Sequence, residues 1–381
     1  MVTLAGVTGV VNHAARCHDA PMLARLAHAF ALSLVTVCPG ALPCRAEVFS
    51  FAAFSGATGQ EVVIYSSLDE RLAQPLIAGF QAENPDVAVR YEDLLTGQIA
   101  ARIVAETDAG GVTADFAFSS AMDLQVKLAN DGYAQEATVP ESAAWPRWAN
   151  WRNMAFALTF EPAVLVYNRP AFAGSAPPAS RYELVQWLAR GGVALHGRIG
   201  TYDIQKSAVG FLFLARDQEH YPDIWSVIRA MGAAGVQEFA TSQEILERVS
   251  DGRLLVGYNI LGSYAADWAR SHPDVGLVLP RDFTVVVSRV GLVPRAAGRP
   301  DLGARFLAFV MSKAGQTILA EKLRLPAVSL EVSAENSAGA MEAALGAQLR
   351  PVPVSPGLLV YLDQSKRARL IARWQAALSG D

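Results

Sequence analysis

The feature that most constrains the fold is a strand–helix alternation near the start of the chain. Three short runs rich in β-branched and aromatic residues are each followed by a segment with helical spacing. The runs span residues 61–66, 87–91 and 115–118. In the first helical segment, Leu72, Leu76 and Phe80 recur every four residues. Strands separated by single helices form βαβ units, so the pattern predicts a parallel sheet and an α/β fold.

A second series of strands and helices follows the first. Its strand-like runs span residues 194–199, 254–258 and 275–279. The chain has 381 residues, of which 52% are hydrophobic. This length exceeds the usual size of one domain, so two lobes are expected.

Residues 154–168 (MAFALTFEPAVLVYN) lie between the two series and predict the passage from one lobe to the other. They contain two apolar runs separated by Glu161-Pro162. We expect residues 155–160 to form a hinge strand and residues 163–167 to form the first strand of the second lobe. The β-branched run near 283–287 is expected to return beside them. The predicted division is therefore 47–158 for the first part of lobe 1, 159–281 for lobe 2 and 282–381 for the second part of lobe 1.

The C-terminal part predicts further helices. Residues 301–311 are strongly apolar, and residues 312–322 continue that helix or add a second one. Residues 362–378 predict an amphipathic helix. Its outer face carries four cations, Lys366, Arg367, Arg369 and Arg373.

The N-terminal 46 residues are typical of a secretory leader. An apolar stretch at 26–38 follows Arg16 and Arg25, and a small residue, Ala46, closes the segment. The stretch is too short for a membrane anchor, which needs about 20 apolar residues. We predict a signal peptide over residues 1–46 and a periplasmic location. Translation could start at Met1 or at Met22.

Composition excludes several function classes. The net charge is −4 and no basic tract is present, which argues against binding to nucleic acid. All three cysteines lie in the leader, so the mature chain has no thiol nucleophile. Its three histidines, at positions 196, 220 and 272, are far apart, and no nucleophile-elbow, dinucleotide, phosphate-loop or zinc-helix motif occurs. The sequence predicts no catalytic residues and no cofactor, and it leaves metal ligands unassigned.

Hydroxyl, amide and carboxylate groups recur just past the predicted strands. In open α/β sheets, ligands bind beyond the carboxyl ends of the strands, where helix N-termini also favour anions. The alternative is that the serines and threonines only cap helices and the tyrosines only pack. The candidate ligand contacts are Ser66, Ser67, Thr96, Ser119, Ser120, Tyr167, Tyr202, Asp203, Tyr258, Asn259 and Tyr264.

Several segments, in their order and spacing, resemble a known family. They are VVIYSSLDE (62–70), ADFAFSSAMDLQVKLANDGYA (114–134), PAVLVYNRP (162–170), GTYD (200–203), GYNILGSYA (257–265), ARFLAFVMSKAGQTILAE (304–321) and the tail 353–374. Together they resemble periplasmic solute-binding proteins of ABC importers, in the type 2 periplasmic-binding fold and in the group that includes ferric-ion-binding proteins.

The resemblance implies two lobes, each a mixed and mainly parallel sheet flanked by helices, joined by two crossing strands. It implies a small solute or ion caught between lobes that close on it, an ABC permease as partner, and a monomer. The strand-end residues given above would contact the ligand.

One departure from the group concerns iron. Ferric-ion binders commonly present two adjacent tyrosines, whereas this chain has Tyr258-Asn259 and then Ser263-Tyr264. Fe(III) favours anionic oxygen ligands, so the loss of one phenolate weakens the case for bare iron. We favour a small anionic or zwitterionic organic solute, or a metal complex. The alternatives are a ferric-ion carrier, a sensing module for a membrane kinase, and a secreted α/β enzyme.

Overall fold

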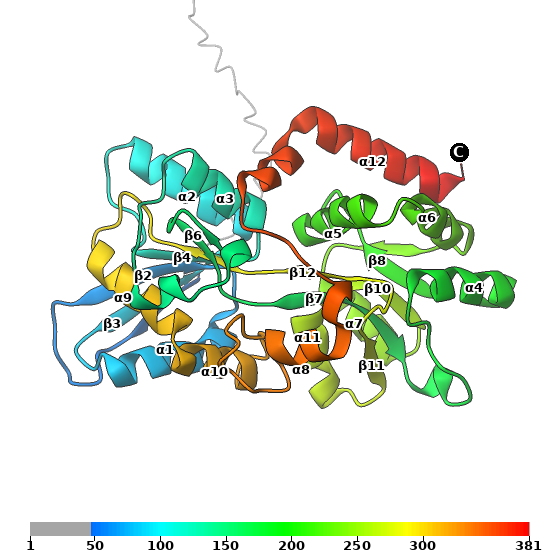
Figure 1. Cartoon of the computed structure of the whole chain (residues 1–381), viewed down its shortest axis with the longest axis horizontal. Helices are drawn as coiled ribbons and strands as arrows, with labels where there is room; N and C mark the ends of the chain where they lie inside the picture. The colour runs from blue at the N-terminus through cyan, green and yellow to red at the C-terminus, as the bar shows by residue number, and fades with distance from the viewer. Residues whose placement is uncertain (1–46, 381) are drawn as a thin grey trace, which may run out of the picture. The chain divides into compact units, whose positions relative to one another are not determined.

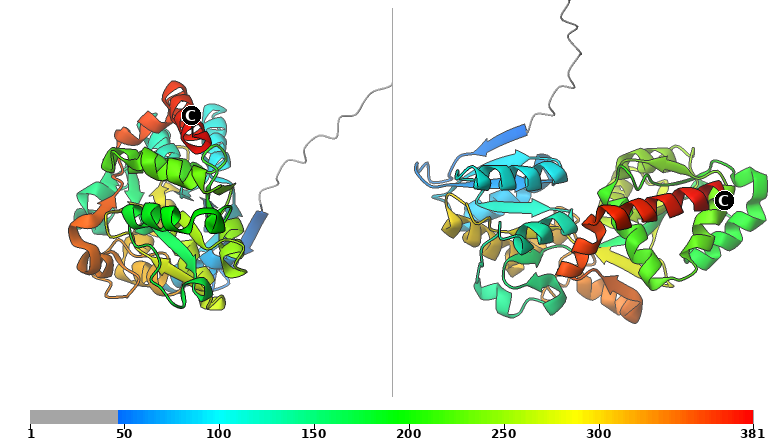
Figure 2. Two further views of the ribbon diagram at one scale, coloured as in Figure 1. Left: turned by 90° about the vertical axis from the view of Figure 1, so that its right-hand side faces the viewer. Right: turned by 90° about the horizontal axis from the view of Figure 1, so that it is seen from above.

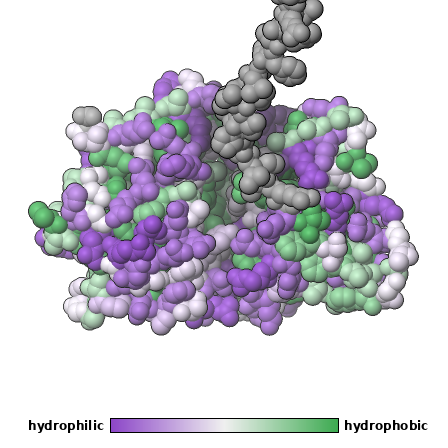
Figure 3. All heavy atoms as spheres, turned by 180° about the vertical axis from the view of Figure 1, so that it is seen from behind, coloured by the Kyte–Doolittle hydropathy of each residue, from purple (hydrophilic) through white to green (hydrophobic). Residues whose placement is uncertain are grey.

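The computed structural model describes residues 47–380. The predicted signal peptide lies outside the described residues. Within them, no helix is both long enough and apolar enough to cross a membrane. The surface seen in Figure 3 is mainly hydrophilic, with hydrophobic residues scattered over it.

The first sheet has seven strands in the order β1-β3-β2-β4-β13-β6-β5. They are β1 (Glu47–Phe51), β2 (Glu61–Ser66), β3 (Ala88–Asp93), β4 (Phe116–Ser119), β5 (Asn150–Trp151), β6 (Ala155–Ala157) and β13 (Val290–Leu292). Strand β2 runs parallel to β3 and β4, with helices between them in the chain. This confirms the βαβ pattern predicted from the sequence.

Helices flank this sheet, as Figure 1 shows. They are α1 (Glu70–Glu83), α2 (Thr96–Asp108), α3 (Met122–Asn130), α9 (Pro300–Met311) and α10 (Lys313–Glu321). The apolar face of α1 packs on α9 through Phe80, whose ring meets Phe306 edge-on with centroids 5.0 Å apart. Such aromatic contacts add to the burial that fixes α1 on the sheet.

The second sheet is built mainly from the middle of the chain, in the order β14-β12-β7-β10-β8-β9, and β11 also pairs with β7. Its strands are β7 (Glu161–Asn168), β8 (Ile199–Tyr202), β9 (Gln237–Phe239), β10 (Val256–Leu261), β11 (Val275–Val278), β12 (Thr284–Val287) and β14 (Leu349–Pro351). The remaining helices are α4 (Arg181–Gly191), α5 (Ala208–His220), α6 (Ile224–Ala233), α7 (Ser242–Ser250), α8 (Gly262–Ser271), α11 (Ala338–Leu345) and α12 (Gln364–Ser379).

Two adjacent chain segments connect the sheets. Strand β6 pairs with β13 in the first sheet, and β7 pairs with β12 in the second. Between them, the Leu158 N–H donates to the Arg289 carbonyl at 2.9 Å, and the Arg289 N–H donates to Thr159 Oγ1 at 2.7 Å. The predicted pairing of the two crossing stretches is confirmed.

The structure corrects the position of the hinge strand. Residues 155–157 form β6 inside the first sheet, so the connection proper is residues 158–160 rather than 155–160. Glu161 and Pro162 do not separate two strands, because β7 begins at Glu161 and both residues pair with β12. Glu161 is tolerated in a buried strand because polar partners surround its carboxylate.

The C-terminal segment contacts elements on both sides of the crossing. The 3-10 helix η6 (Pro356–Leu362) packs on α3, and α12 packs on α6. Figure 2 shows α12 from above, running along the second-sheet side. The predicted lobe boundaries at 158/159 and 281/282 stay a prediction. Strands β12 and β14 belong to the second sheet, and α12 packs on α6.

We predict that Thr159→Val destabilises the fold by about 1–3 kcal/mol, because it leaves the buried Arg289 N–H without a partner and removes the hydrogen bond to Glu161 Oε1. Urea unfolding followed by circular dichroism measures the change. The control is Thr317→Val, whose hydroxyl bonds the Lys313 carbonyl at an exposed position and should cost under about 0.5 kcal/mol. Equal effects for the two variants would contradict this account of the crossing.

Candidate functional site

A buried ion pair lies where the chain crosses between the sheets. Arg289 follows β12 and Glu161 opens β7, and each side chain is 1% exposed. The Arg289 Nε lies 3.3 Å from Glu161 Oε1. Thr159 donates to the same oxygen at 2.7 Å, and the Ser263 hydroxyl donates to the other oxygen. The carboxylate is therefore held by groups from the crossing and from α8.

Arg289 also reaches the first sheet. Its Nη1 donates to the Ser67 carbonyl at 3.4 Å, and Ser67 Oγ accepts the Ser120 N–H at 3.2 Å. On the other side, the guanidinium carbon lies 5.8 Å from the centre of the Tyr264 ring. Ser67, Ser120 and Tyr264 are each partly exposed. Arg289 thus connects strand ends of the first sheet with the start of α8.

Arg289 stays protonated and positively charged. Burial acts to lower the pKa of its guanidinium, but Glu161 and the Tyr264 hydroxyl act in the opposite direction and outweigh burial. The pKa therefore lies above the usual range. Although Glu161 is close, Arg289 Nε forms no hydrogen bond with any described residue. Nε faces Glu161 Oε1 at ion-pair distance without hydrogen-bond geometry. A charged guanidinium beside partly exposed side chains is a group that can bind an anion.

Tyr202 supports the second-sheet side of this group. Its hydroxyl accepts the Leu261 N–H at 3.2 Å and lies 2.5 Å from Ser242 Oγ. Leu261 directly precedes α8, so this bond fixes the turn that presents Ser263 and Tyr264. Burial raises the pKa of Tyr202 to about 12, so its hydroxyl stays protonated at neutral pH.

Helix N-termini follow the strand ends that meet here. Helix α1 begins shortly after Ser67, α3 begins shortly after Ser120, and α8 begins at Gly262. In α1 the Asp93 carboxylate accepts the Glu70 N–H at 3.2 Å, and in α3 the Asp123 carboxylate accepts the Leu124 N–H at 2.9 Å, whereas the residue that precedes α8 provides no side-chain cap. Free N–H groups and the helix dipole favour negative charge at such ends. The arrangement can hold an anion together with Arg289.

Two of the predicted ligand contacts, Ser66 and Ser119, fit the alternative in which a serine only caps the backbone. Ser66 and Ser119 are buried, and each hydroxyl accepts a backbone N–H two residues later, from Leu68 and Ala121. These serines shape the turns that present Ser67 and Ser120. Their hydroxyls are engaged locally rather than turned to a ligand.

Three further predicted ligand contacts, Thr96, Asp203 and Tyr167, form no contact with Arg289 among the described residues. Thr96 begins α2. Asp203 pairs with Lys206 at 2.8 Å. Tyr167 lies near the end of β7 opposite Glu161, where it packs edge-on against Phe172 with centroids 5.6 Å apart.

Tyr258 and Asn259 lie in a different buried cluster, which we call the Arg181 network. Tyr258 Oη and Asn259 Nδ2 both donate to Asp217, at 2.7 and 2.6 Å. Arg181 donates to Asp217 at 2.7 Å and to Tyr258 Oη at 3.0 Å, and its Nη1 reaches Asp282 and the Phe283 carbonyl. Tyr258 is 2% exposed and Asn259 is 4% exposed.

This network fixes a bulge in β10. The pairing of β10 with β7 shifts register between Gly257 and Ile260, and Asn259 has a φ of 57°. Asparagine tolerates this left-handed conformation better than most residues. The polar side chains of Tyr258 and Asn259 therefore hold the backbone that leads into α8. The sequence placed them at the ligand because it could not show Arg181 and Asp217 beside them.

The sequence reading missed Arg289 and Glu161. A signal was present, because each is a lone charge inside an apolar run, in TVVVSRVGLV and TFEPAVLV. Opposite charges in two strands predicted to pair could have suggested a buried ion pair. In the described residues, no group of three or more His, Cys, Asp or Glu residues could hold a metal ion.

Comparisons with known proteins identify the family. The model of the bacterial extracellular solute-binding protein family matches residues 75–346. The substrate-binding protein of an ABC transporter from Agrobacterium tumefaciens is 66% identical, with a TM-score of 0.81 over 88% of this chain and 100% of that one. The chain belongs to this family of extracellular solute-binding proteins. No curated protein sequence matches it significantly.

More distant structures share the two-lobed periplasmic-binding fold. AfuA from Actinobacillus pleuropneumoniae, with fructose-6-phosphate bound, is 17% identical and has a TM-score of 0.66 over 84% of this chain and 99% of that one. Iron-bound HitA from Pseudomonas aeruginosa is 16% identical and has a TM-score of 0.64 over the same shares. At these identities the likeness extends to the fold, which confirms the predicted fold class.

We predict that Arg181→Met destabilises the protein by about 3–5 kcal/mol, because it leaves Asp217 as an unpaired charge that is 0% exposed. Guanidinium unfolding measures the loss. Arg253→Met, which breaks an ion pair on a side chain 59% exposed, is the control and should have little effect. A loss for Arg181→Met as small as that of the control would show that the network is not structural.

Proposed function

We propose that the protein is the solute-binding component of an ABC importer and that it captures a small anionic solute beside Arg289. The 66% identity to an ABC-transporter substrate-binding protein supports the transport role. Such a protein acts by binding rather than by catalysis, works in the periplasm, and hands its solute to a membrane permease. It acts as a monomer.

One observation carries the choice of ligand class. Arg289 is buried and charged, and it contacts Ser67 after β2 on one side of the crossing and Tyr264 at the start of α8 on the other. A ligand that reaches this guanidinium also meets Ser67 and Ser120 from the first sheet and Tyr264 from the second. An anion between them would be held by a charge-assisted bond and by helix N-terminal N–H groups.

The same observation disfavours a bare ferric ion. A cation at this position would be repelled by Arg289, and Tyr258 is engaged inside the Arg181 network rather than free to bind a metal. AfuA and HitA show that one fold can bind a sugar phosphate or iron. The side chains at the crossing of this chain suit the anionic class.

Ligand binding would favour closure of the lobes. Residues 158–160 and 288–289 are the connections about which they can rotate, and Arg289 is part of one of them. A solute that touches both sides is bound more tightly when the lobes are closed, so it shifts the population toward the closed state.

A thermal-shift screen tests the ligand class. Carboxylates, phosphate esters, phosphonates, amino acids, polyamines and Fe(III) are compared at one ionic strength. We expect an anion or zwitterion to raise Tm, because binding to the folded state alone adds about 2.7 kcal/mol at a hundredfold excess over Kd. Stabilisation by Fe(III) or a polyamine alone would contradict the proposal.

Variants then test the site with the best stabiliser from that screen. Tyr264→Ala and Ser67→Ala should each weaken its binding by about tenfold, because each removes a partly exposed group beside Arg289. Tyr258→Phe is the matched control, which should lower stability and leave affinity unchanged, since its hydroxyl is engaged with Asp217. Isothermal titration calorimetry measures both, and loss of affinity in Tyr258→Phe alone would move the site to the Arg181 network.

A further inference from the structure

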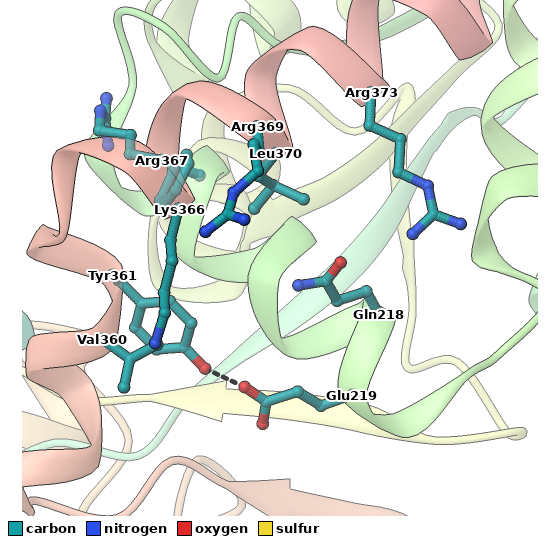
Figure 4. A pocket seen from close by; sticks show the side chains of 10 residues that line it. Gln218, Glu219, Val360, Tyr361, Lys366, Arg367, Arg369, Leu370 and Arg373 are labelled. Carbon is teal, nitrogen blue, oxygen red and sulfur yellow. Dashed lines mark hydrogen bonds between the residues drawn. The ribbon is translucent and has the colours of Figure 1, made fainter.

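A cavity lies beside the C-terminal helix, away from the crossing. The cavity, of about 280 Å³, is bounded by η6, the first half of α12, and α5. Figure 4 shows Lys366, Arg369 and Arg373 extending from α12 toward α5, which carries Gln218 and Glu219. We call this cavity the α12 pocket.

The lining of the α12 pocket is strongly cationic. Lys366, Arg367, Arg369 and Arg373 all line it. The side chains of these four residues form no ion pair with any described residue. Side-by-side cations without partners repel one another, so an anion placed among them is favoured.

The only carboxylate among the lining residues is Glu219, and it is already neutralised. Arg216 pairs with it at 2.7 Å, and the Tyr361 hydroxyl donates to its other oxygen. Asp363, just outside the pocket, caps α12 by accepting the Lys366 N–H at 2.8 Å. The Lys366 N–H and the charges of Lys366 and Arg369 lower the pKa of the Asp363 carboxyl. The protein therefore balances the positive charge of the pocket only in part.

Two of the guanidinium groups are held in place by aromatic rings. Arg367 lies over Phe211 at 4.2 Å from the ring centre, and Arg373 lies over Trp225 at 4.1 Å. A guanidinium stacked on a ring keeps its edge N–H groups free for an oxyanion. Less side-chain entropy is then lost when the anion binds.

We propose that the α12 pocket is a binding site for a small polyanion, a molecule with two or more carboxylate or phosphate groups. The cations line a concavity of small-molecule size instead of spreading over a flat face, and this favours a compact ligand over an acidic protein surface. This site is distinct from the solute site beside Arg289. None of the residues that line it belongs to the proposed solute site.

Calorimetric titration with inorganic pyrophosphate, and separately with citrate, tests the proposal at fixed ionic strength. The double variant Lys366→Gln with Arg369→Gln removes two exposed cations and should weaken pyrophosphate binding by about tenfold or more. Parallel loss for citrate would indicate a site for polyanions in general, and loss for one probe alone would assign the site to phosphates or to carboxylates. Circular dichroism checks that the variant is folded.

The matched control is Lys313→Gln with Lys322→Gln, which removes the same charge at α10, an element that packs on α1 and α9. This control and Tyr264→Ala should both keep pyrophosphate affinity. Affinity lost in Tyr264→Ala but kept in the pocket variant would place the anion beside Arg289 and overturn the proposal. Equal losses in pocket and control variants would show a general charge effect, which also overturns it.

A further arm uses vesicles containing phosphatidylglycerol. If the pocket variant abolishes vesicle binding while neither soluble probe binds the wild-type protein, the cations form a membrane-facing surface and the proposal is wrong.

Discussion

The buried pair of Glu161 and Arg289 is the interaction on which the rest of the site depends. Two charges removed from water cost several kcal/mol unless further hydrogen bonds satisfy them. Here Thr159 and Ser263 satisfy the carboxylate, and Ser67 receives one guanidinium N–H. These partners come from the crossing, from α8 and from the first sheet. The charge requirement of one ion pair thus fixes the relative placement of the elements around the proposed ligand.

The protein contains a second fully buried arginine, and the contrast between the two clarifies their roles. Every nitrogen of the Arg181 guanidinium has a partner, since Nε, Nη1 and Nη2 reach Tyr258, Asp282 and Asp217. Arg289 keeps an Nε without a hydrogen bond and lies beside partly exposed groups. A saturated network holds a fold, whereas an incompletely satisfied cation has binding capacity left for a ligand.

The sequence predicted what depends on local pattern. The strand-like runs located β2, β3 and β4 of the first sheet, and the paired apolar stretches located the crossing, because period and length alone carry that information. Choosing among the strand-end hydroxyls required tertiary contacts. Tyr258 and Tyr264 are both tyrosines near the end of one strand, yet a partner 77 residues away in sequence, Arg181, draws the first into the core. Propensity and spacing cannot separate two such residues, since only the fold decides what lies beside each hydroxyl.

The C-terminal segment shows how one element can link both lobes without being part of either sheet. Helix α12 is held to the second-sheet side by Arg367 over Phe211, by Arg373 over Trp225, and by the Trp374 indole, which donates to Glu238 at 2.7 Å. Between η6, which carries the buried Leu358, and α3, the described residues form a packing contact and no hydrogen bond. Directional contacts resist displacement more than apolar ones, because a hydrogen bond is lost over small changes in distance and angle. We therefore expect α12 to stay with the second sheet when the lobes rotate, and the η6–α3 contact to take up the movement.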